Sequence, residues 1–145
     1  MADADAVASN GFTCLHRSAS EGYQGITEAL LRAGANVDAE HSGTGVTPLF
    51  TAISQGRLAS VARLLAAGAD PEHERKDGAV PLHWASYFSH SKIVDALLES
   101  GADPDSQNDD GHTPFDLATD ETARGKEAPF TPHIYKSRRD SSVYI

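Results

Sequence analysis

The histidines are the residues of this sequence best suited to proton transfer or metal binding, and their spacing argues against both roles. The chain has seven histidines, and five of them show no spacing that would put two on one helix face: His41, His73, His90, His112 and His133. No Cys or His cluster with the ligand spacing of a zinc site accompanies them. We therefore expect no metal site and no cofactor.

The paired carboxylates and the single cysteine also have simpler explanations than catalysis. Asp109-Asp110 and Asp120-Glu121 are neighbours in sequence rather than facing pairs, so solvated loops and helix ends explain them better than general acid and base roles. Cys14 is able in principle to act as a nucleophile, but its place at a helix start favours a small packed residue. The sequence therefore predicts that the chain is not an enzyme.

Three aromatic residues form the most distinctive group that remains. Trp84, Tyr87 and Phe88 stand at positions i, i+3 and i+4, so on a helix they would lie on one side and form a continuous patch. Large aromatic side chains are enriched in the hot spots of protein interfaces. This group is therefore a candidate partner-binding site.

Charge and composition limit the class of partner. The 145 residues carry a formal net charge of −9, which argues against nucleic acid because phosphate contacts need clustered Lys and Arg. One cysteine cannot form an internal disulfide, and no 18-residue apolar run indicates membrane insertion. The first ten residues lack the basic and apolar regions of a signal peptide. We expect a protein partner and an intracellular location, cytoplasmic or nuclear.

The elements that position these residues recur along the chain. One four-residue opening appears at steps of 34, 33 and 33 residues, as Thr13-Cys14-Leu15-His16, Thr47-Pro48-Leu49-Phe50, Val80-Pro81-Leu82-His83 and Thr113-Pro114-Phe115-Asp116. Each opening predicts a first helix, and apolar residues at helical spacing predict a second helix that ends near Gly34, Gly68 or Gly101. We expect Thr13 and Thr47 to cap their helices. Neither helix can bury its apolar side alone, so neighbouring pairs must stack.

A period of about 33 residues with a T-P-L-H-x-A opening resembles the ankyrin repeat. The resemblance covers about Asn10 to Ala123 and implies an all-α solenoid of stacked helix-turn-helix units with β-hairpin finger loops. It divides the chain into a flexible lead-in (1–9), three repeats (about 10–42, 43–75 and 76–108), a partial repeat (109–124) and a C-terminal tail (125–145). The loop between the first two repeats has one extra residue, so its tip should bulge.

The resemblance also assigns roles to residues. It implies that His16 and His83 hydrogen-bond locally as scaffold, and that a partner binds the concave side, through the fingertips and the variable residues late in each first helix. The variable pairs are Ser20 and Glu21, Ser54 and Gln55, Tyr87 and Phe88, and Asp120 and Glu121; the fingertip candidates are His41, Val46, Lys76, Ala79, Asp110 and His112. We expect Tyr87 and Phe88 to be exposed, whereas for Trp84 packing against Leu117 is slightly favoured over binding.

One turn residue departs from its counterparts in the other repeats. Ser89 stands where Gly22 and Gly56 hold the turn between the two helices, which predicts a positive φ at a residue that bears a Cβ.

The fourth repeat and the tail differ from the body. Gly125, Pro129 and Pro132 exclude a second helix in its usual register, so the end of the stack should expose an apolar face. The tail has a net charge of +2, which leaves −11 for residues 1 to 124, and it offers apolar anchors at Phe130, Ile134, Tyr135, Val143, Tyr144 and Ile145. We expect it either to cover the open end or to bind a partner.

These features together predict a non-catalytic protein-protein interaction module, acting as adaptor, scaffold or inhibitor and monomeric when free. The alternative is a structural subunit of a large assembly, anchored by its C-terminal tail.

Overall fold

A computed structural model describes residues 3–119 of the chain, and residues 1–2 and 120–145 lie outside the described part. Between residues 3 and 119 the chain forms helices, with no strand and one isolated bridge between Val7 and Thr13. The helices are α1 (Cys14–Glu21), α2 (Gln24–Arg32), α3 (Pro48–Ser54), α4 (Leu58–Ala66), α5 (Pro81–Tyr87), α6 (Ser91–Glu99) and α7 (Pro114–Thr119).

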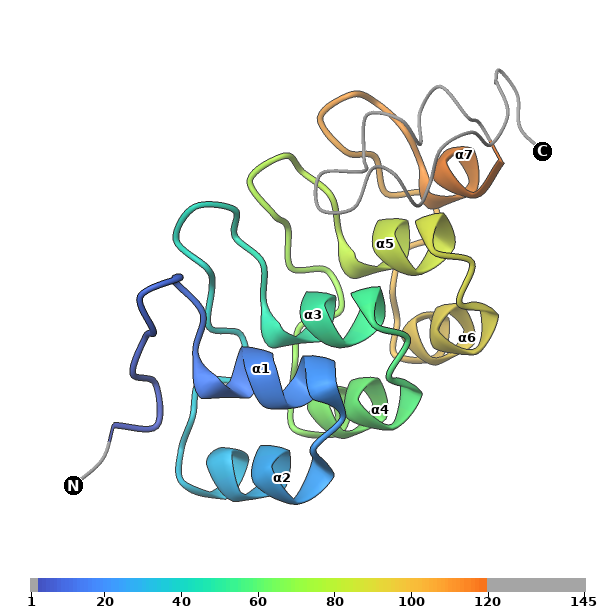
Figure 1. The fold of residues 1–145 in the computed structure, drawn as a ribbon. Helices are drawn as coiled ribbons and strands as arrows, with labels where there is room; N and C mark the ends of the chain where they lie inside the picture. The colour runs from blue at the N-terminus through green and yellow to red at the C-terminus, as the bar shows by residue number, and fades with distance from the viewer. Residues whose placement is uncertain (1–2, 120–145) are drawn as a thin grey trace.

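The helices lie in two rows, as Figure 1 shows. The first helices of the repeats form one row, in which α1 packs on α3, α3 on α5 and α5 on α7. The second helices form the other row, in which α2 packs on α4 and α4 on α6. The finger loops project from the side of the first row, and we call the angle between fingers and first row the concave face. The predicted all-α repeat fold is confirmed.

The core lies between the two rows. Leu15, Leu49 and Leu82 occupy the same position of successive first helices and are at most 2% exposed. Burying each such side chain stabilises the fold by about 1.5–3 kcal/mol. Their counterpart in the fourth repeat, Phe115, is 58% exposed, because no second helix among residues 3–119 follows α7. The described end of the stack is therefore open at Phe115.

Two buried histidines join the start of a first helix to the next finger. The Nδ1 atom of His16 accepts a hydrogen bond from the Thr13 N–H (3.1 Å), and its Nε2–H donates to the Val46 carbonyl (2.8 Å). His83 repeats this arrangement with the Val80 N–H (3.1 Å) and the His112 carbonyl (2.8 Å). Burial lowers the pKa of both histidines. Both rings are held neutral as scaffold, as expected.

The second repeat lacks this device, and the predicted cap at Thr47 is wrong. Thr47 Oγ1 is buried, and it has no hydrogen-bond partner among the residues that the structure describes. Phe50 stands where the other openings have His16, His83 and Asp116, so no ring nitrogen or carboxylate completes the turn. At Thr13 the expected cap is present, since Oγ1 accepts a hydrogen bond from the His16 N–H (3.3 Å).

Each finger turns back through one backbone hydrogen bond rather than a paired hairpin. The closing bonds run from Arg75 N to Ala79 O (2.9 Å) and from Asn108 N to His112 O (3.0 Å). In the first finger the bond joins His41 N to Val46 O (2.9 Å) and encloses one more residue, which confirms the predicted bulge. The β-hairpin expectation is met only as tight turns, since residues 3–119 hold no strand.

The lead-in forms a further finger and is not frayed as expected. Ala8 N donates to Phe12 O (2.9 Å), the same closing bond as in the later fingers. Asp5 Oδ1 accepts a hydrogen bond from the Asn36 N–H (2.7 Å), just as Asp38 Oδ1 accepts from the Asp70 N–H (3.1 Å) one repeat later. The described lead-in is therefore in register with the stack.

The turns between paired helices explain why a serine is tolerated at one of them. Ser89 has φ 61°, close to the 76° of Gly22 and the 68° of Gly56, as predicted. A Cβ at Gly22 or Gly56 would also press on the side chain of the next repeat, at 3.3 Å from Arg57 and 3.0 Å from His90. Ser89 itself is exposed, so its Cβ meets only the cost of the backbone conformation.

Candidate functional site

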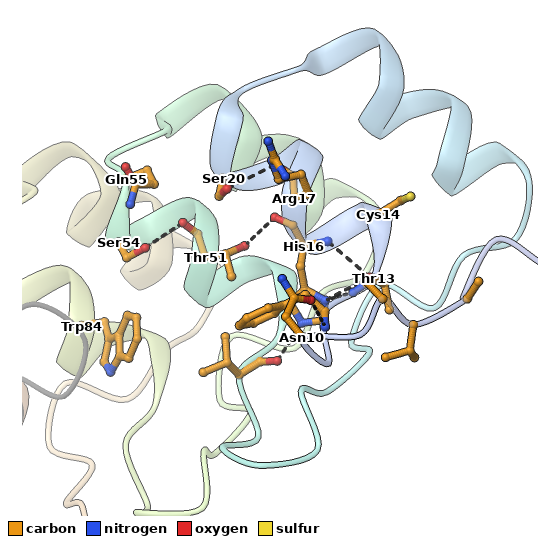
Figure 2. Close-up of a pocket in the computed structure, with 15 residues that line it drawn as sticks. Asn10, Thr13, Cys14, His16, Arg17, Ser20, Thr51, Ser54, Gln55 and Trp84 are labelled. Atoms are coloured by element: carbon orange, nitrogen blue, oxygen red, sulfur yellow. Dashed lines mark hydrogen bonds between the residues drawn. The ribbon is translucent and has the colours of Figure 1, made fainter.

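A groove of about 610 Å³ lies on the concave face, between the lead-in finger and the first row of helices. Figure 2 shows Arg17 and Ser20 of α1 beside Thr51, Ser54 and Gln55 of α3, with Trp84 of α5 farther along. The variable positions predicted for the first two repeats therefore do line a hollow, through Ser20, Ser54 and Gln55.

The floor of the groove presents little hydrogen-bonding capacity. Thr51 Oγ1 donates to the carbonyls of His16 (3.0 Å) and Pro48 (2.7 Å), so its hydrogen is shared within the helices. Ser54 and Ser20 likewise donate to helix carbonyls one turn back, at 2.9 Å and 3.2 Å. The floor therefore offers methyl and methylene surface rather than free donors, which favours an apolar ligand.

The lead-in finger forms the wall of the groove, which the sequence analysis missed. Val7 is 63% exposed, and the half-buried ring of Phe12 packs on His16 (5.2 Å between ring centroids) and His41 (4.4 Å). The signal was present, because Asn10-Gly11 precedes Phe12-Thr13 as Asp110-Gly111 precedes His112-Thr113.

Trp84 is buried, but its neighbours are not the expected ones. It is 3% exposed and packs edge-to-face on Phe50 of the preceding repeat, 5.1 Å between ring centroids, instead of on Leu117. The guanidinium carbon of Arg75 lies 4.7 Å from the Trp84 ring centroid, so a cation also faces the indole. Trp84 packs toward the second repeat because Phe50 replaces the histidine there.

Tyr87 corrects the expectation of an exposed aromatic pair. It is 2% exposed and shares a small cluster with Leu117 and the half-buried Phe88. The rings of Trp84, Tyr87 and Phe88 do touch in sequence, at centroid distances of 5.8 Å and 5.4 Å through Phe88. The predicted aromatic patch exists, but it is mostly internal because α7 packs on α5 beside Tyr87.

The fingertip candidates divide into two groups. Lys76 and Asp110 are exposed, and His41 and His112 are half-buried. Val46 and Ala79 are 1% and 0% exposed, so the expectation that they reach a partner is wrong. Both residues immediately precede a helix opening, where the finger returns to the core. The candidates Asp120, Glu121, Phe130, Ile134, Tyr135, Val143, Tyr144 and Ile145 lie outside the described residues.

The rim of the groove carries polar groups near its N-terminal end. The exposed side chains of Arg17 and Glu21 form an ion pair (3.3 Å). Cys14, expected to be packed, is an exposed free thiol on the groove lining. Across residues 3–119 no three His, Cys, Asp or Glu side chains converge so that they could hold a metal ion. None of the helices in this range is long and apolar enough to cross a membrane.

Comparison with known families decides what this arrangement is. The signature described as ankyrin repeats (3 copies) matches residues 1–75, 39–108 and 60–125. The chain belongs to the ankyrin-repeat family. Ankyrin repeats as a class bind protein partners and are typically non-catalytic, so the concave groove is a candidate protein-binding surface.

Curated proteins with similar segments are all much longer than this chain. It is 39% identical over 71 residues to the palmitoyltransferase Hip14 of Drosophila melanogaster, covering 49% of this chain and 11% of that protein. It is 36% identical over 84 residues to a transient receptor potential cation channel subfamily A member 1 homologue of Caenorhabditis elegans, covering 58% and 7%. It is 42% identical over 55 residues to the mouse (Mus musculus) 2-5A-dependent ribonuclease, covering 38% and 8%. The similarity therefore concerns the repeats alone.

Proposed function

We propose that this chain is a non-catalytic adaptor, scaffold or inhibitor that binds a protein partner in the groove of its concave face. The observation that carries the proposal is the groove itself, whose floor of small side chains on α1 and α3 is walled by Val7 and Phe12. A partner would bury an apolar side chain there, with Arg17, Lys76 and Asp110 at the rim. We also propose that the chain is monomeric when free and works inside the cell.

The groove floor offers a direct mutational test. Ser54→Arg places a long charged side chain on the floor, and we expect it to weaken partner binding at least tenfold, about 1.4 kcal/mol. The matched control is Ser100→Arg, because Ser100 is exposed at the end of α6 in the other row. The measurement is the affinity of each variant for a partner captured by the wild-type chain, with a thermal melt to show that both variants fold.

Equal binding by the two arginine variants would contradict the proposal and place the interface elsewhere. Obligate co-purification with other chains would favour the alternative of a structural subunit.

A further inference from the structure

The concave face does not keep the same exposure from one repeat to the next. The fourth residue of each first helix is Arg17, Thr51 or Trp84. The Arg17 side chain is 74% exposed and Thr51 is half-buried, yet Trp84 is only 3% exposed. The largest of the three side chains is thus the most buried, although its position faces the same way in the stack.

The seventh residue of each first helix repeats this contrast. Ser20 and Ser54 are half-buried, whereas the much larger Tyr87 is 2% exposed. Both anomalies fall on α5, the helix on which α7, the last described helix, packs. The concave face of α5 is therefore treated as interior, while that of α1 and α3 stays open as a groove.

We propose that the C-terminal tail, residues 125–145, docks on the concave face of α5 as an intramolecular ligand. The tail supplies apolar anchors, Phe130, Ile134 and Tyr135, that match the aromatic surface of Trp84, Tyr87 and Phe88. Its net charge of +2 is opposite to the −11 of residues 1–124. Both the apolar and the charged parts of the tail are therefore complementary to the body.

The tail also has the reach to dock there. Residues 120–145 follow directly after α7, which ends at Thr119 in the same row of helices as α5. Neighbouring helices lie about 8–10 Å apart, and an extended chain covers about 3.3 Å per residue. The five residues before the tail span that step, and the tail remains for contact.

The docked tail limits where a partner binds. The groove over α1 and α3 stays accessible, whereas α5 becomes available only when the tail leaves. A partner that needs the whole concave face thus competes with residues 125–145. This regulatory consequence rests on the proposed function, but the docking itself does not.

Trp84 is the chain's single tryptophan, so its fluorescence reports the docking without any partner. In the full-length chain we would replace Phe130, Ile134 and Tyr135 together by alanine. We expect acrylamide quenching of Trp84 to rise roughly twofold or more and its emission to shift to the red, because a buried indole becomes wet. The matched control replaces Ser137, Ser141 and Ser142 by alanine and should leave both signals unchanged. Thiol labelling of Cys14 and circular dichroism verify that the stack stays folded.

Two results would overturn the proposal. Unchanged quenching and emission in the folded anchor variant would show that residues 125–145 do not cover α5. Quenching of the wild type that rises on dilution would show that a second copy of the chain is the cover. Either result leaves the proposed function standing, because that proposal is tested by binding to a partner.

Discussion

Ser89 shows how a single backbone angle links the repeat pattern to stability. A residue with a Cβ at positive φ costs about 1 kcal/mol, so Ser89→Gly should stabilise the fold by up to about 1 kcal/mol, reduced by glycine's unfolded entropy. Gly56→Ser is the reverse change at the matched position, and it should cost more because its Cβ would lie 3.0 Å from His90 Cε1. Urea denaturation midpoints measure both effects. A clearly lower midpoint for Ser89→Gly would contradict the strain.

His16 and His83 make the fold sensitive to mild acid. Burial lowers the pKa of each, so the unfolded chain binds protons more readily than the folded one. Their contribution to stability is fully present above the unfolded pKa of about 6.5 and is lost as pH falls toward the folded pKa. We expect the free energy of unfolding to decrease between about pH 7 and pH 5.

A histidine variant isolates this dependence from that of the carboxylates. His83→Gln keeps a donor for the His112 carbonyl but does not titrate, so its stability should fall less steeply over the same pH range. The measurement is chemical denaturation at several pH values. Parallel slopes for wild type and variant would show that His83 does not contribute.

At the scale of the element, the register of the helices could be predicted but the neighbours of particular side chains could not. The recurring openings located the start of each first helix, because Pro48, Pro81 and Pro114 have no backbone donor to satisfy there. Periodicity assigns a residue to a face without saying what packs against that face. Trp84 and Tyr87 were misjudged for this reason, since Phe50 and Leu117 supply contacts that only the folded stack defines.

The fingers show the same limit. One extra residue correctly predicted the longer first fingertip, because chain length is read directly from sequence. Val46 and Ala79 were predicted to be accessible, yet each lies where the finger returns to the core. The lead-in finger was missed because no second helix precedes it in the sequence.

The contact between α5 and α7 gives an element-scale prediction. Tyr87→Ala removes a ring that is 2% exposed and packs with Leu117, so it should lower the free energy of unfolding by about 3 kcal/mol. Ser20→Ala, at the equivalent position of α1, should change it by less than about 0.5 kcal/mol. Thermal melts of the two variants provide the comparison. Equal melting temperatures would mean that Tyr87 is not part of the core.

At the scale of the whole molecule, the stack has one open groove and one open end. Repeats contact only their neighbours, so each surface is decided locally. The groove lies at the N-terminal half, over α1 and α3, and the exposed Phe115 marks the other end. Their separation allows one surface to bind while the other is covered.

The measurement that tests the central claim most directly is a map of amide chemical shifts during titration with a captured partner. We predict that perturbations concentrate at Val7, Phe12, Ser20, Ser54 and Gln55, which line the groove, and spare the exposed outer residues of α2, α4 and α6. Perturbations confined to the outer row of helices, with the groove amides unmoved, would contradict the claim that the concave face binds the partner.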